Sequence, residues 1–174
     1  MKKQNKPTEE LSLKDILRNV LEEASMVLPG IQALFGFQLV AVFDRAFIEI
    51  SSSDKCMHMA ALMLTICAIG CLMAPASYHR QVEHDVVSQA FIVYASKLLC
   101  IGMAPLLFSI SLDTYVVCHA IIGNSVAAGV AALFSFSLLS TLWYIVPQAQ
   151  KRFLRLAADK RRSENNADSL VLNR

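Results

Sequence analysis

A few ionisable side chains lie within or beside long apolar runs, and they are the residues best placed to do chemistry. Lys97 stands inside one run, and a charge at membrane depth costs roughly 2.5–3.5 kcal/mol, which makes it a candidate functional group. Its side chain leans toward the N-terminal end of its helix, so the ammonium can also snorkel to the interface. Two hypotheses follow: a functional lysine, or a snorkelling or structurally paired one. The predicted pairing partners are Glu23, Gln32, Tyr78 and His79.

The carboxylates near the apolar runs fall toward one membrane boundary rather than the midplane: Asp44, Glu49 and Asp113. A carrier coupled to protons or cations usually has acidic groups at the midplane, so this placement counts against ion coupling. Asp44 would move inward if the first span were tilted. We favour an interfacial pair with Arg45, or a capping contact, as the role of Asp44.

Histidine, serine and cysteine give no pattern typical of a metal site or a hydrolase. His79 and His84 flank a connection on one side of the predicted membrane, whereas His58 and His119 lie on the other side, so they cannot share one metal. We interpret them as hydrogen-bonded surface groups. Serines within the runs have no His–acid partner at matching depth. Cys67 and Cys71 share a helix face but have no nearby ligand, which favours packing roles. We therefore predict no catalytic residue, metal or cofactor.

Four apolar runs dominate the chain, at about residues 29–48, 57–76, 90–112 and 121–146. The chain is 55% hydrophobic, and each run has about the ~20 residues that a helix needs to cross a bilayer. Because lipid cannot hydrogen-bond to backbone groups, each run should be a continuous helix. The sequence predicts an all-α fold, a transmembrane bundle of four helices within residues 28–147.

An amphipathic helix is predicted before the first span, within a polar segment of residues 1–27. Apolar residues recur at three- and four-residue steps from Leu13 to Leu28, with charges mostly elsewhere. Pro29-Gly30 predicts a bend where this helix meets the first span. We expect the helix to lie along the membrane surface, either as an anchor, which we favour, or as a docking surface for a partner.

The distribution of lysine and arginine predicts the orientation. Thirteen of these residues flank the predicted bundle on the side that holds both termini, and Arg45 and Lys55 lie on the other. Cytoplasmic loops are enriched in such residues, so both termini should be cytoplasmic. We predict no removable signal. The basic residues are explained by anionic lipid headgroups, so no nucleic-acid partner is needed.

Short connections and small residues predict further details. The third and fourth spans should be joined tightly around Asp113-Thr114, with Gly123 and Asn124 marking the start of the fourth span. Ser125 and Gly129 form a small-xxx-small pair, which permits close helix packing within the bundle or with a second copy. Residues 148–174 should form a basic, partly disordered tail. The predicted partners are membrane lipids, with a homo-oligomer or an unidentified membrane protein possible.

Three segments together resemble a bacterial membrane family known as domain of unknown function 6328. They are the region of Leu28-Pro29-Gly30-Ile31-Gln32, Ala74-Pro75-Ala76-Ser77-Tyr78-His79-Arg80, and Leu142-Trp143-Tyr144-Ile145-Val146-Pro147. The resemblance implies four transmembrane helices with both ends in the cytoplasm of a bacterium, and no established activity. Some members carry a sodium:proton antiporter label. Lys97 stands where the family allows Arg or Asn. The residues that match the family pattern are Glu23, Gln32, Tyr78, His79 and Arg80.

The favoured function is that of a small inner-membrane protein acting as a structural or interaction component without catalytic activity. With Lys97, the family-matching residues form a predicted polar cluster at the cytoplasmic boundary. The alternative is a subunit of an oligomeric ion transporter or channel, similar to a sodium:proton antiporter. In that case Gln38, Asp44 and Lys97 would line the ion path.

Overall fold

The computed structural model describes residues 13–82 and 88–158, without the side chains of Leu13, Lys14 and Leu17. Every long element in these ranges is a helix, which confirms the all-α prediction. The elements are α1 (Leu13–Ala41), α2 (Arg45–Glu49), α3 (Ser52–Val82), α4 (Gln89–Ile122), α5 (Ser125–Ser140) and a π-helical turn (Thr141–Ile145), after which the chain stays helical to Ala158.

Four of the described helices are long and apolar enough to cross a membrane. The spans are Arg18–Ala41, Ser52–Val82, Gln89–Ile122 and Ser125–Ala158. Their lengths of 24, 31, 34 and 34 residues exceed the ~20 residues needed to cross the hydrocarbon, so their ends extend into the headgroup region. The four-span prediction is confirmed.

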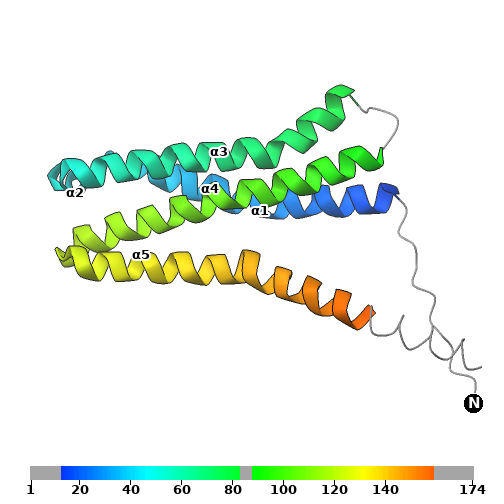
Figure 1. Ribbon diagram of the computed structural model, residues 1–174. Coiled ribbons are helices and arrows are strands. Elements are labelled where there is room, and N and C mark those ends of the chain that lie inside the picture. Colours follow the sequence, from blue (N-terminus) through cyan, green and yellow to red (C-terminus); the bar gives the residue numbers. More distant parts are fainter. Residues whose placement is uncertain (1–12, 83–87, 159–174) are drawn as a thin grey trace, which may run out of the picture.

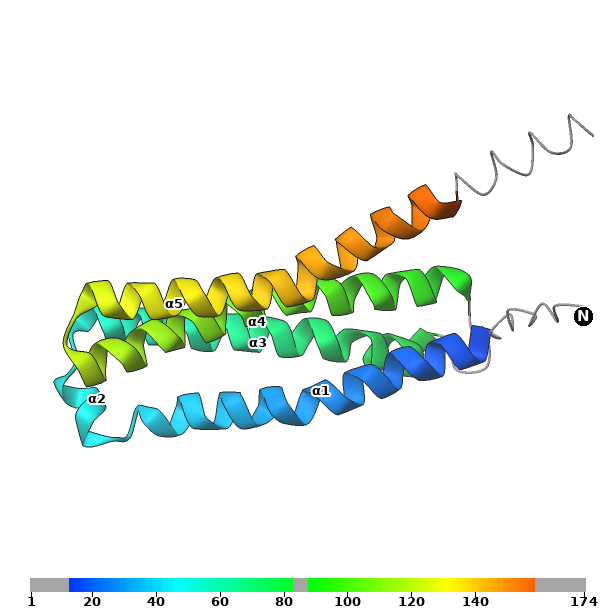
Figure 2. The same ribbon diagram turned by 90° about the horizontal axis from the view of Figure 1, so that it is seen from below.

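Helices α3 and α4 form a central antiparallel pair, and α1 and α5 lie on opposite sides of it (Figures 1 and 2). The start of α1, the end of α3, the start of α4 and the end of the α5 helix lie together (Figure 1). We call this the basic end, after its described basic residues, and the opposite end the α2 end. The basic residues are Arg18, Arg80, Lys151, Arg152 and Arg155.

The predicted amphipathic segment and the first span form one continuous helix. α1 runs through Pro29 without a break, since interrupting backbone hydrogen bonds in lipid is costly. One face of its N-terminal half, with Ile16, Val20 and Leu21, packs against a buried cluster on α4. The amphipathic pattern therefore reflects contact with the bundle, and the expected separate surface helix is replaced by an extension of the first span.

The first span ends earlier than predicted, at Ala41 rather than near residue 48. Asp44 explains the change of direction because its Oδ1 accepts from the Ala46 N–H at 2.8 Å and caps α2. The alternative of a capping contact for Asp44 is confirmed.

The connection between the third and fourth spans is not at Asp113-Thr114, and that prediction is wrong. α4 continues through both residues to Ile122, because Thr114 bonds back to the Ile110 carbonyl and Asp113 has partners on other helices. Gly123, with φ +68°, ends α4 and donates to the His119 carbonyl at 2.9 Å. Asn124 caps α5 through the N–H groups of Val126 and Ala127, as expected for the start of the fourth span.

Helices α3 and α4 approach each other closely at Gly102. A Cβ built there would lie 3.0 Å from Cys71 Cβ and 3.3 Å from Leu72 Cγ. Gly129, by contrast, has nothing within 4 Å of its Cβ position. Gly129 is therefore not at a close helix contact within the described part of the chain, whereas Ser125 lies 3.2 Å from His119 Nε2 on α4.

The end of the fourth span bends at the π-helical turn Thr141–Ile145, which directly precedes Pro147 (Figure 2). Proline lacks an N–H and collides with the preceding turn, and a widened turn accommodates both. The predicted tail of residues 148–174 is helical to Ala158, and the rest of it lies outside the described residues.

A buried polar network and cavity as the candidate functional site

Polar side chains from three helices meet inside the half of the bundle nearest α2. On α3, His58 and Thr65 lie seven residues apart on one face; on α4, Ser109 and Asp113 lie four apart; and α1 contributes Gln38. At ~1.5 Å per residue, His58 lies about 9 Å and Thr65 about 20 Å from the start of α3, which is 31 residues long. The network thus extends from the α2 end toward the middle of the spans.

His58 joins the last turn of α1 to α4. Its Nε2 lies 2.9 Å from the Gln38 backbone oxygen, and its Nδ1 lies 3.1 Å from Asp113 Oδ1. The Gln38 carbonyl can only accept, so Nε2 carries a proton. The histidine and aspartate side chains are only 8% and 16% exposed.

Gln38 connects this pair to a hydroxyl chain deeper in the bundle. Its Nε2 donates to Asp113 Oδ2 and, at 3.0 Å, to Ser109 Oγ. Ser109 donates to the Ala61 carbonyl at 2.8 Å and lies 2.7 Å from Thr65 Oγ1.

An apolar cluster lies next to Thr65 and Ser109, on the side that faces the basic end. It brings together buried residues of α1, α3 and α4, with Trp143 packed against it: Ile31, Ala68, Leu72 and Leu106. Among the described residues, the hydrogen-bonded network does not continue past this cluster toward the basic end.

The interpretation of His58 as a surface group is wrong, since the residue is 6% exposed. Asp113 was expected at the connection between the third and fourth spans and instead lies nine residues before the end of α4. A signal was present: His58 and Thr65 share the face of α3 that also carries the buried Ala61, Ala68 and Leu72. Polar residues in register with a buried helix face indicate a buried polar contact.

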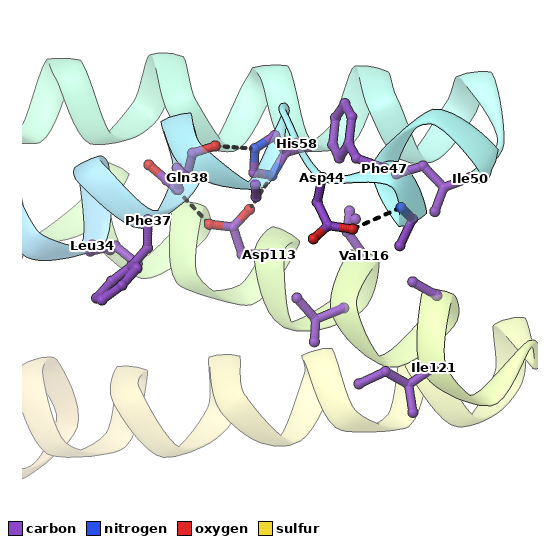
Figure 3. Close-up of a pocket in the computed structure, with 14 residues that line it drawn as sticks. Leu34, Phe37, Gln38, Asp44, Phe47, Ile50, His58, Asp113, Val116 and Ile121 are labelled. Carbon is purple, nitrogen blue, oxygen red and sulfur yellow. Dashed lines mark hydrogen bonds and ion pairs between the residues drawn. The ribbon is translucent and has the colours of Figure 1, made fainter.

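A cavity of about 470 Å³ borders the network between α1, α2 and α4. Figure 3 shows Gln38, His58 and Asp113 on one wall and Asp44 on another. Most of the remaining lining is apolar, including Phe37, Phe47 and Ile121. Phe37 and Ile121 are 74% and 77% exposed, so the cavity opens on the outer surface of the bundle.

A second polar contact ties the start of α3 to the α4–α5 connection. Asp54 is buried, its N–H donates to Ser51 Oγ at 3.1 Å, and its Oδ2 accepts from Ser51 Oγ at 2.8 Å. Its carboxylate also lies 2.9 Å from His119 Nδ1, and His119 Nε2 lies 3.2 Å from Ser125 Oγ. This contact joins the start of α3 to the end of α4 and the start of α5.

The structure does not gather the predicted cytoplasmic-boundary cluster into one hydrogen-bonded site. Tyr78 and His79 both stack on Phe91, with ring centroids 5.4 and 5.6 Å apart, respectively. His79 Nδ1 is buried without a described hydrogen-bond partner. The other members are exposed, and no hydrogen bond or ion pair joins them within residues 13–82 and 88–158: Glu23, Gln32, Arg80 and Lys97.

The structure does not bring the three predicted ion-path residues together. Gln38 and Asp44 line the α2-end cavity, whereas Lys97 lies on the other half of α4 and does not line it. Within the described ranges, no group of three or more His, Cys, Asp or Glu residues could hold a metal ion. The chemistry available in the cavity is therefore hydrogen bonding and charge pairing.

A family model described as "Family of unknown function (DUF6328)" matches residues 8–147 of the chain. No curated protein and no solved structure matches it.

Proposed function

We propose that the chain, which belongs to the DUF6328 family of unknown function, is a structural or interaction component of a membrane without catalytic activity. The observation that carries this proposal is the placement of α1 and α5 as flanking helices. Only 11% of the most apolar window of α1 and 6% of that of the α5 span are buried within the chain, against 33% for α3 and for α4. Two long apolar faces are thus left for lipid, a second copy or another membrane protein.

The apolar cluster beneath the polar network also supports this proposal. A conducting protein needs polar or water-lined surface along its path. Ile31, Leu72 and Leu106 pack together at the point where such a path would have to continue.

We place the protein in the bacterial inner membrane with both termini in the cytoplasm. The support is the excess of lysine and arginine at the basic end, because such residues are retained on the cytoplasmic side. Cys56 is exposed near the α2 end, so a membrane-impermeant maleimide should label it in intact spheroplasts. Labelling only after lysis would contradict this orientation.

Photocrosslinking tests the interaction role. Phe134 is 68% exposed on α5, and p-benzoylphenylalanine at this position should give a protein adduct of fixed mass in native membranes. Phe136 is the matched control because its ring packs on Phe108 of the same chain, with centroids 5.4 Å apart. Lipid adducts alone at Phe134 would contradict an interaction through α5.

An ion-transport subunit is the second candidate, favoured by the His58–Asp113 pair within the spans. Purified protein in liposomes distinguishes the two functions. The structural proposal predicts no sodium or proton flux above that of empty liposomes under an imposed gradient. Flux that Asp113→Asn abolishes and that Glu49→Gln preserves would establish transport instead.

A further inference from the structure

The α2-end cavity has the dimensions and lining of a ligand site. Its volume of about 470 Å³ lies within the ~300–1,000 Å³ typical of small-molecule sites. Such sites are mostly apolar with a few polar groups that fix orientation, and this lining has the same character. One water occupies about 30 Å³. A bare ion with a few waters would therefore fill only a small part of the cavity and would leave most of its apolar wall without contacts.

The charge of the cavity is negative. Asp44 and Asp113 both line it, and His58 is the third titratable group there. His58 is hydrogen-bonded to Asp113, and no lysine or arginine lines the cavity, so the carboxylate of Asp44 has no basic partner among the lining residues.

We propose that the α2-end cavity binds a protonated organic amine that has an apolar body. The ammonium lies between the carboxylates of Asp44 and Asp113. The apolar body occupies the space between Phe37 and Phe47, whose rings also attract cations. The ligand enters through the opening on the outer surface of the bundle, where Phe37 and Ile121 are exposed. This binding role is independent of whether α5 contacts a partner protein.

Three compounds of one shape test the charge requirement. The purified full chain in lipid nanodiscs is titrated with 1-adamantylammonium, 1-adamantanol and adamantane-1-carboxylate, with empty nanodiscs subtracting partition into lipid. The ammonium should bind at least about tenfold more tightly than the alcohol, because a charge pair in a partly buried site readily contributes 1.4 kcal/mol. The carboxylate should not bind. Equal binding of all three, or no saturable binding of the ammonium, would overturn the proposal.

Variants locate the binding. Asp44→Asn should weaken ammonium binding about tenfold while keeping the cap of α2, since asparagine caps helices as well as aspartate does. Glu49→Gln removes a neighbouring exposed carboxylate outside the cavity and is the matched control, with affinity expected to be unchanged. Equal weakening by both substitutions would mean attraction to surface charge only and would contradict the site.

Discussion

The two ends of the bundle are held together in different ways. At the α2 end, α1 is joined to α3 and α4 by hydrogen bonds from Gln38 and His58. At the basic end, α1 is joined to α4 by apolar contacts around Phe91, Ile92 and Ala95. In lipid, apolar contacts gain from packing but little from the hydrophobic effect, whereas polar side chains supply directional bonds. We infer that the polar network fixes the position of α1, and that the apolar contacts at the basic end adapt to that position.

The largest expected effect comes from breaking the pair at the α2 end. Asp113→Ala leaves His58 buried without its carboxylate, and removing one member of a buried pair costs roughly 3–5 kcal/mol. Unfolding measured by steric trapping in bicelles should show this loss. Asp113→Asn is the control, since its amide oxygen still accepts from His58, and it should cost less than half as much. Equal costs for the two substitutions would mean that the hydrogen bond is unimportant.

A comparable substitution at the basic end should cost less. Phe91 is 2% exposed, and Phe91→Ala removes a ring that contacts both Tyr78 and His79, at a cost of about 3 kcal/mol. Hydrogen exchange should rise in the N-terminal half of α1 and stay low near Gln38. Phe108→Ala is the control because Phe108 is 51% exposed. Faster exchange at both ends of α1 would contradict the independence of the two regions.

A substitution at Gly102, which lies between the two ends, tests the contact between α3 and α4. Gly102→Val places a side chain against Cys71 and Leu72 and should cost about 2 kcal/mol through overpacking. Gly129→Val is the matched control in monomeric protein, since its Cβ position is open. A loss of stability at Gly129 that grows with protein concentration would instead indicate a contact between copies.

The smallest effect is expected at Lys97. The residue is exposed, and no described partner binds its ammonium, so Lys97→Met should change the free energy of unfolding by less than about 0.5 kcal/mol. The same unfolding assay measures it. A loss above about 1 kcal/mol would reveal a structural pair, as one of the hypotheses from the sequence requires.

The sequence predicts the helices better than the site. Apolar runs of span length depend on the local sequence, and so does the turn at Gly123 and Asn124, where glycine and an N-cap act on neighbouring residues. His58 and Asp113 are 55 positions apart, and only the packing of α3 on α4 brings them together. Asp113 was placed at a turn because carboxylates are rare within spans, whereas a buried partner makes its position inside α4 tolerable.

The first span illustrates the same limit. The Pro29-Gly30 pair is a turn signal in water, but in lipid the backbone keeps its hydrogen bonds and α1 continues through both residues. The amphipathic pattern before Pro29 was visible in the sequence. Its partner was not, because Phe91 and Ile92 lie some 70 residues further along the chain.

A double-mutant cycle on His58 and Asp113 is the most direct test of the account, whose central claim is that this pair fixes α1 on the α3–α4 core. The free energy of unfolding is measured by steric trapping for the wild type, His58→Ala, Asp113→Ala and the double variant. The account predicts a coupling energy of about 2 kcal/mol, typical of hydrogen bonds to charged groups. Additive effects, with a coupling energy near zero, would contradict it.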